Sequence, residues 1–218
     1  MDEQQDHYFT ARPASPAELR RVPVRLAGQD VEVVTASGMF SPDGIDKGTR
    51  VLLKEAPAPP ATGAFLDLGC GWGPLALTLA LESPAATVHA VDVNERALDL
   101  CRRNAASLGC TGVRAGTPED VDPGTRFDLI WSNPPIRVGK AVLHDLLTTW
   151  LPRLSEEPVA PGPSGVAGAA AYLVVQKNLG ADSLQTWLRA TLPGLMGPVA
   201  VERVASSGGF RVLRVTRT

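Results

Sequence analysis

The sequence predicts an α/β fold in which helices cover both faces of a mostly parallel sheet, and this sheet ends in an antiparallel hairpin. From about residue 60 onward, short β-rich runs alternate with segments of helical periodicity, as is typical of parallel strands joined by helices. The last two apolar runs, 199–204 and 210–215, are separated only by the segment 205–209, which is too short for a helical crossover. These two strands are therefore expected to pair antiparallel.

Runs rich in aliphatic and β-branched residues supply the parallel strands, at residues 64–68, 87–92, 112–115, 127–132 and 169–176. The clearest helix between them begins after the N-cap Asn94 and ends at Gly109. Its apolar stripe follows one helical face and consists of Leu98, Cys101, Ala105 and Leu108. A further helix is expected around residues 183–192, before the hairpin.

Residues 1–60 are predicted to form a small β extension, and residues 61–218 the main domain. Two short apolar runs, 22–26 and 31–34, flank a turn and predict a β-hairpin. The proline-containing segment 55–63 predicts a stiff linker into the sheet. A second proline-rich segment, 156–168, predicts a mobile surface loop.

Composition and charge narrow the class of protein. In a chain of 218 residues that is 44% hydrophobic, no apolar run approaches the roughly 20 residues of a membrane helix. The acidic, polar start differs from a signal peptide, so a cytoplasmic protein without a membrane partner is expected. Cys70, Cys101 and Cys110 lack paired spacing, so neither a disulfide nor a metal site is expected. A net charge of -2 argues against binding of nucleic acid by the overall charge of the protein. Only a local cluster of basic residues could supply a surface that attracts phosphates.

A glycine-rich loop follows the first strand of the sheet. Gly69, Gly71 and Gly73 alternate there, and glycines let the backbone turn tightly and let a ligand lie against it. A dinucleotide site has GxGxxG spacing and holds a pyrophosphate, whereas this loop has GxGxG spacing and follows an acid, Asp67. An acid at that turn favours a cationic ligand. S-adenosylmethionine, which carries a sulfonium and an ammonium, is such a ligand.

The end of the second strand carries another acid, Asp92. A carboxylate at this place can accept both ribose hydroxyls of an adenosine, in nicotinamide sites and in methyl-donor sites alike. The alternative is that Asp92 only helps to cap the helix that follows. Together with the glycine loop, it indicates a nucleoside ligand.

The turn Asn133-Pro134-Pro135-Ile136 directly follows the fourth strand. The prolines fix φ and remove N–H donors, which leaves hydrogen-bond acceptors on a rigid turn. A planar amino group is a poor nucleophile because its lone pair is delocalised. Acceptors on the Asn133 side chain and the Pro134 carbonyl would hold the two amino protons and aim the lone pair at a methyl group. Positioning and dipoles together can remove on the order of 10 kcal/mol from a barrier.

The order of these motifs resembles class I S-adenosylmethionine-dependent methyltransferases with an Asn-Pro-Pro signature. The similarity is greatest to the ribosomal RNA small-subunit methyltransferase C family, which methylates guanine N2 in 16S rRNA. The segment GMFSPDGIDKGT at 38–49 and the final hairpin at 207–213 are similar to that family, and the resemblance spans roughly residues 20–218. It implies a seven-stranded Rossmann-like sheet and a methyltransferase domain in residues 61–218. It also implies an rRNA or 30S-subunit partner and no metal.

The resemblance assigns residues to the cofactor and to the target amine, whereas the charged substrate candidates have ordinary surface charges as their alternative. From the methionine end through ribose to adenine, S-adenosylmethionine is expected against Asp67, Gly69, Cys70, Gly71, Gly73, Asp92, Val93, Gly116, Thr117 and Asn133. The target amine is expected at Asn133, Pro134, Pro135 and Ile136. Candidate contacts to the substrate are Phe40, Lys47, Arg137, Lys140, Lys177 and Arg211.

Two departures from the family affect the substrate. Many enzymes with this signature have an aromatic residue where this chain has Ile136, and stacking is worth about 1–3 kcal/mol per base. Either another ring, such as Phe40 or Trp72, supplies the stacking, or the substrate differs. Larger members carry an additional N-terminal half, and this chain resembles the compact relatives.

The substrate is less constrained than the reaction. Protein glutamine and small-molecule amines are alternative acceptors for the same signature. A non-catalytic RNA-binding or ribosome-assembly module is a further alternative, which intact Asp67, Asp92 and Asn133 disfavour. The glycine spacing disfavours a dehydrogenase, and nothing in the sequence predicts the oligomeric state.

Overall fold

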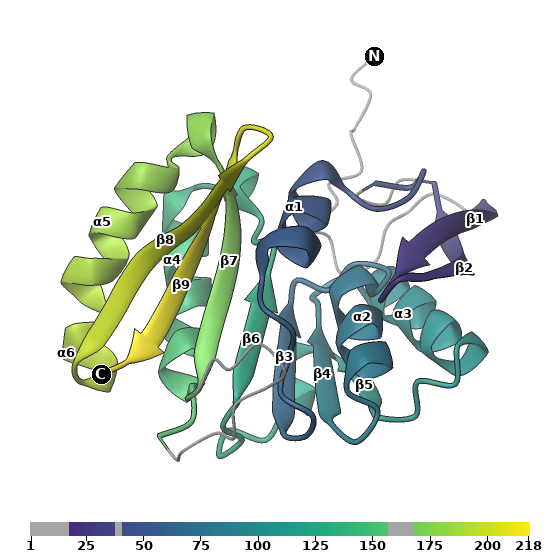
Figure 1. The fold of residues 1–218 in the computed structure, drawn as a ribbon, viewed down its shortest axis with the longest axis horizontal. Coiled ribbons are helices and arrows are strands. Elements are labelled where there is room, and N and C mark those ends of the chain that lie inside the picture. Colours follow the sequence, from purple (N-terminus) through teal and green to yellow (C-terminus); the bar gives the residue numbers. More distant parts are fainter. Residues whose placement is uncertain (1–17, 38–40, 157–167) are drawn as a thin grey trace.

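The computed structural model describes residues 18–37, 41–156 and 168–218. Its main sheet has seven strands in the order β5-β4-β3-β6-β7-β9-β8, and a separate two-stranded sheet is formed by β1 and β2 (Figure 1). The strands are β1 (Leu19–Leu26), β2 (Gln29–Ala36), β3 (Ala64–Leu68), β4 (Thr87–Val91), β5 (Val113–Gly116), β6 (Leu129–Ser132), β7 (Ala170–Gln176), β8 (Val199–Ser207) and β9 (Phe210–Arg217). The helices are α1 (Lys47–Glu55), α2 (Pro74–Glu82), α3 (Glu95–Ser107), α4 (Lys140–Trp150), α5 (Ala181–Thr191) and α6 (Pro193–Met196).

The predicted sheet topology is confirmed. Strands β3 to β7 pair in parallel, whereas β9 pairs antiparallel with both β7 and β8. The antiparallel position of β9 brings its first residue, Phe210, opposite Gln176 at the end of β7. The edge at which the parallel strands end is therefore also the edge at which β9 begins.

Alternating strand residues build a hydrophobic layer on each face of the sheet. Phe65 of β3 packs with apolar side chains of α1, α2 and α3, whereas its neighbour Leu66 packs with those of α4 and α5. This alternation follows from the two-residue period of a strand. Helix α3 starts after Asn94, whose side chain accepts hydrogen bonds from the backbone N–H groups of Arg96 (3.0 Å) and Ala97 (3.3 Å), so the predicted N-cap is confirmed.

The predicted N-terminal hairpin is present as β1 and β2, and it is tied to the main domain by Asn104 of α3. The Asn104 amide accepts from Val34 N (2.7 Å) and donates to Val34 O (3.0 Å) and to Trp72 O (3.1 Å). One side chain thus joins the hairpin to the glycine loop. The boundary at residue 60 stays a prediction, although Leu26 and Val33 of the hairpin pack in the core that β3 shares.

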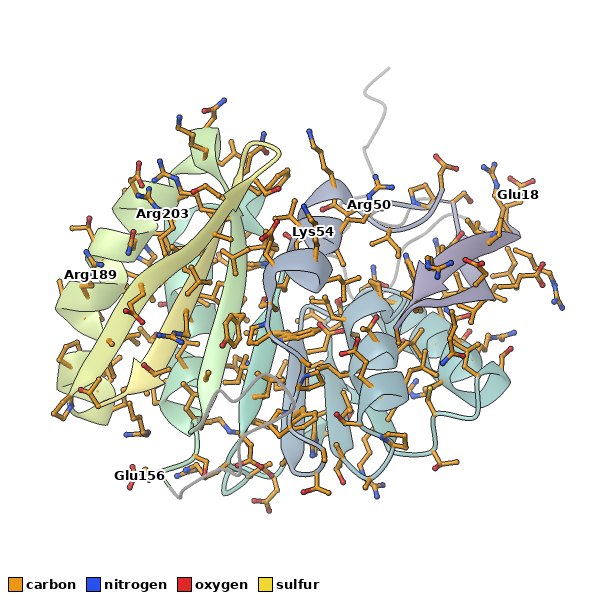
Figure 2. The ribbon with its side chains drawn as sticks, viewed as in Figure 1. Glu18, Arg50, Lys54, Glu156, Arg189 and Arg203 are labelled. Atoms are coloured by element: carbon orange, nitrogen blue, oxygen red, sulfur yellow. The ribbon has the colours of Figure 1, made fainter. Side chains whose placement is uncertain are left out.

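Helix α1 was not predicted by the sequence. Its N-cap is Asp46, whose carboxylate accepts from the backbone N–H groups of Gly48 (2.7 Å) and Thr49 (3.3 Å). Val51 and Leu52 are buried on the face of the sheet to which Phe65 points. Arg50 and Lys54 of the same helix are exposed (Figure 2). Residues 47–55, which were predicted to belong to the small β extension, therefore form a helix that packs on the main sheet.

Neither a membrane-spanning helix nor a metal-binding cluster is found among the described residues. No helix among them is both long and apolar enough to cross a membrane. Nor does this part of the chain contain a cluster of three or more His, Cys, Asp or Glu side chains suited to a metal ion. The interior of the predicted loop 156–168 lies outside the described residues.

Candidate active site

A cavity of about 700 Å³ lies at the edge where β3, β4, β6 and β7 end. This size lies within the roughly 300–1,000 Å³ of small-molecule sites, and the carboxyl ends of parallel strands are where such sites form in open α/β sheets. The three predicted motifs all contribute to its wall. The motif residues that line it are Asp67, Gly69, Cys70, Gly71, Asp92, Val93, Asn133, Pro134, Pro135 and Ile136.

The glycine loop is held in place by the neighbouring strand. The carbonyl of Val91 accepts from the backbone N–H groups of Gly69 (2.8 Å) and Cys70 (3.0 Å). At Gly73 the backbone has a φ of +100°, and a Cβ atom there would lie 2.8 Å from the Cys101 sulfur. This glycine is therefore required both by the backbone conformation and by the packing of α3 against the loop.

Asp67 is fully buried between the loop and α2. Its Oδ2 accepts from the backbone N–H of Ala76 at 2.9 Å, and so caps a helix whose own N-cap, Gly73, has no side chain. Among the described residues, no hydrogen-bond partner meets Asp67 Oδ1. Burial raises the pKa of Asp67 to about 8, an effect that the Ala76 hydrogen bond opposes and the Asp92 charge increases. A buried carboxyl with an unsatisfied oxygen at a cavity wall suits a cationic group.

Asp92 follows β4 and is 8% exposed. Its Oδ2 accepts from Gly71 N and its Oδ1 from Asn94 N, both at 2.9 Å. Burial raises the pKa of Asp92, while hydrogen bonds from the backbone of Asn94, Gly71 and Val93 lower it. A carboxylate offers about four lone-pair sites, so Asp92 can still accept from a ligand beside these backbone donors.

The Asn133 turn is fixed from two sides. The Ser132 hydroxyl donates to the Leu68 carbonyl at 2.7 Å, which ties the end of β6 to the end of β3. Asn133 Nδ2 donates to Asp46 Oδ2 at 2.9 Å and to Thr49 Oγ1 at 3.1 Å. Both partners also line the cavity. Sequence reasoning missed them, although a capping aspartate ahead of an apolar run was a usable signal for α1.

A family model described as the methyltransferase small domain matches residues 30–214 of this sequence. The chain belongs to this family. By fold and family it is an S-adenosylmethionine-dependent methyltransferase, as the sequence predicts.

The relatives of this chain within the family include an uncharacterized protein and rRNA methyltransferases. It is 34% identical over 181 residues to the uncharacterized protein YbxB of Bacillus subtilis, a match that covers 82% of this chain and 85% of the relative. It is 30% identical over 177 residues to ribosomal RNA small subunit methyltransferase C of Aeromonas hydrophila, over 79% of this chain but 51% of the relative.

Among solved structures, a 16S rRNA N2 methyltransferase of T. thermophilus in complex with AdoMet and guanosine is similar in fold. The TM-score is 0.69 at 22% sequence identity, and the match covers 94% of this chain and 52% of that one. The chain therefore spans about half the length of the rRNA methyltransferases that it matches.

In this methyltransferase fold, the cavity offers partners for two groups of the cofactor, its ammonium and its ribose. The unsatisfied oxygen of Asp67 suits the ammonium, and Asp92 has lone pairs left for the ribose hydroxyls. Three residues predicted near the cofactor do not line the cavity: Gly73, Gly116 and Thr117. Pro118, one residue beyond that predicted adenine turn, does line it.

None of the predicted substrate residues that the structure describes lines the cavity, apart from those of the Asn-Pro-Pro turn. Lys47, Lys140 and Lys177 are exposed and do not line the cavity. Arg211 is largely buried and makes an ion pair with Asp182 of α5, so its charge is already neutralised. Phe40 and the side chain of Arg137 lie outside the described residues.

The two rings at the cavity differ from the predicted pair. Trp72 lines the cavity but is 2% exposed and packs in the core, so little of its face is free for stacking. Phe210, which sequence reasoning did not select, also lines the cavity and is half-buried. Of these two rings, Phe210 is the more exposed.

Asp92→Ala is expected to weaken S-adenosylmethionine binding by about 1.5–3 kcal/mol, because hydrogen bonds to a charged group have this value. Titration calorimetry at fixed pH measures the loss. Asp145→Ala, which removes an exposed carboxylate from α4, is the matched control and should leave the affinity unchanged. Equal affinity of the Asp92 variant and wild type would contradict the ribose assignment.

Proposed function

We propose that this chain transfers a methyl group from S-adenosylmethionine to the exocyclic N2 amine of a guanine in ribosomal RNA of the small subunit. The observation that carries the proposal is the position of the Asn133-Pro134 turn. It lines the same cavity as the glycine loop and Asp92, so an amine held by the turn faces the place predicted for the cofactor. Similarity to a small-subunit rRNA methyltransferase supports the choice of substrate.

The chain's own contribution to this reaction is to bind and orient the amine. When bound, S-adenosylmethionine supplies an activated methyl group on its sulfonium. The Asn133 side-chain oxygen and the Pro134 carbonyl each accept one N–H of the target amine. Holding both protons in place keeps the nitrogen lone pair directed along the line of transfer, and the two dipoles stabilise positive charge that develops on the nitrogen.

The outer part of the cavity suits a planar base. Apolar side chains line it from the Asn-Pro-Pro turn and the residues that follow it, from α4, from the segment after β7 and from β9. The set comprises Ile136, Val138, Val142, Leu146, Leu179 and Phe210. Phe210 can supply the stacking that Ile136 does not. Val142 and Leu179 remain 55% and 42% exposed at its rim, and exposed apolar side chains beside a site are typical of a binding surface.

Two exposed lysines are sequence neighbours of residues that line the cavity. Lys47 and Lys177 directly follow the lining residues Asp46 and Gln176. Within the described residues neither lysine makes an ion pair, whereas Arg21 and Arg25 of β1 are paired with acids. Local cations at the mouth of a site can hold phosphates even when the whole chain is slightly acidic.

Incorporation of labelled methyl groups tests this function. The protein is incubated with methyl-labelled S-adenosylmethionine and, separately, with 30S subunits, 50S subunits, free 16S rRNA, a release-factor-like protein and a metabolite extract. We expect N2-methylguanine in small-subunit RNA. Once the site is mapped, a transcript with inosine at that position is the matched control, because inosine lacks only the N2 amine. Label found in protein or metabolites alone would overturn the RNA assignment.

A further inference from the structure

We propose that Asp46 and Thr49, at the start of α1, are positioning residues that fix the Asn133 amide with its oxygen directed to the target amine. This inference rests on the proposed N-methylation. It assigns a role to two residues that are distant from Asn133 in the sequence, at separations of 87 for Asp46 and 84 for Thr49.

The hydrogen bonds around Asn133 involve only one end of its amide. Nδ2 uses its two hydrogens, one to Asp46 Oδ2 at 2.9 Å and one to Thr49 Oγ1 at 3.1 Å. In the part of the chain that the structure describes, no hydrogen bond reaches Asn133 Oδ1. The donor end of the amide is therefore occupied, and the acceptor end is left for a ligand in the cavity that Asn133 lines.

The chemistry of Asp46 determines which way the amide points. An ionised carboxylate only accepts hydrogen bonds, whereas the two ends of an amide have nearly the same shape and differ in donating or accepting. Turning the Asn133 amide over would set its oxygen against Asp46 Oδ2 and exchange an attractive contact for a repulsive one. The same Asp46 oxygen accepts from Gly48 N at 2.7 Å, so it is itself held by the helix that it caps.

The close fit at Gly48 shows that the start of α1 is packed against the Asn133 turn. A Cβ atom at Gly48 would lie 2.9 Å from the Phe210 ring, 3.0 Å from Asp46 Oδ2 and 3.3 Å from Asn133 Nδ2. Any larger residue would push the helix away from Asn133 or from Phe210. The helix start thus sits between the residue that orients the amine and the ring beside the substrate space.

Asp46→Asn tests the proposal with the smallest change of shape. Asparagine is also a good N-cap, so α1 should persist, but its amide can donate and so allows the Asn133 oxygen to turn toward it. We expect kcat to fall on the order of 10–100-fold while the Kd for S-adenosylmethionine and the Tm stay near wild type. Thr49→Val should lower kcat less, and Thr49→Ser should restore it. Asp99→Asn on the surface of α3 is the control for loss of a charge.

A double-substitution cycle separates positioning from general damage. If Asp46 acts through Asn133, Asp46→Asn should cause no further loss of kcat once Asn133 is alanine. Multiplicative losses in the double variant would overturn the proposal, as would wild-type kcat in Asp46→Asn.

Nuclear magnetic resonance provides a readout that needs no methyl acceptor. With asparagine labelled by ¹⁵N, the wild type gives side-chain amide signals from Asn94, Asn104, Asn133 and Asn178, and Asn133→Ala identifies the relevant pair. Asp46→Asn and Asp99→Asn each add one pair, which is identified by its absence from the wild-type spectrum. In Asp46→Asn we expect this pair to shift and to exchange its hydrogens faster, and in Asp99→Asn to stay unchanged. An unmoved pair in Asp46→Asn refutes the orientation even if RNA is methylated. A moved pair in a protein that methylates no RNA refutes the proposed function and leaves the orientation standing.

Discussion

We expect Asn133→Ala to lower kcat for methyl transfer about 10²–10³-fold, the range typical for loss of one preorganised hydrogen-bonding group that acts on developing charge. The substitution removes one of the two acceptors for the amine. Binding of S-adenosylmethionine should change little, because Asp67, the glycine loop and Asp92 are untouched. Single-turnover assays measure the transfer, and calorimetry measures the affinity for the cofactor.

Two results would contradict this account of Asn133. Equal losses in transfer and in cofactor affinity would show that the turn builds the cofactor pocket, and an unchanged rate would remove Asn133 from the reaction. Asn178→Ala is the matched control, because it truncates an exposed asparagine that does not line the cavity. It should retain wild-type transfer and affinity.

Asp67→Asn is expected to change cofactor affinity and protein stability in opposite directions. Loss of the charge should weaken S-adenosylmethionine binding by about 1.5–3 kcal/mol, the range for hydrogen bonds to charged groups. The cofactor-free variant should nevertheless be more stable than wild type at pH 8, by about 1–3 kcal/mol, because it has no carboxyl group that must be buried as an anion or take up a proton on folding. The amide oxygen can still accept from Ala76 N and cap α2. Urea unfolding without cofactor and calorimetry with it measure the two effects.

The pH dependence of the wild type follows from the same group. Burial raises the pKa of Asp67 from 3.8 to about 8 in the folded, cofactor-free protein. Between these values the folded state holds a proton that the unfolded state has released, so the free energy of unfolding contributed by Asp67 falls as pH rises from about 4 to about 8. Asp67→Asn should lack this decline, and Asp99→Asn should show it in full. A decline of equal slope in the Asp67 variant would assign the effect to other groups.

Local chemistry was enough to predict much of the site. Asp67, Gly69, Asp92 and Asn133 each lie at or just after the end of a predicted parallel strand, and such strands end at one edge of a sheet. The structure accordingly places them around one cavity.

Contacts made by tertiary packing could not be read from local sequence. Helix α1 was missed because Gly48 near its start lowers helix propensity and because the proline-rich segment follows it. Phe210 was missed because its position depends on β9 pairing antiparallel beside β7. The same strand explains Arg211: successive residues face opposite sides, so Arg211 points to α5 and Asp182 while Phe210 packs on the cavity side.

The position of β9 also has a consequence for synthesis of the protein on the ribosome. The glycine loop, Asp92 and Asn133 have all left the ribosome before Phe210 is translated, yet Phe210 lines the cavity that they surround. Its strand must then pair both with β8, the other strand of its hairpin, and with β7, and such strand pairing forms slowly compared with helices. A nascent chain can therefore hold the residues for cofactor and amine while it still lacks the wall against which a substrate packs. Competence to bind substrate is gained only when the last strand of the sheet has been made and paired.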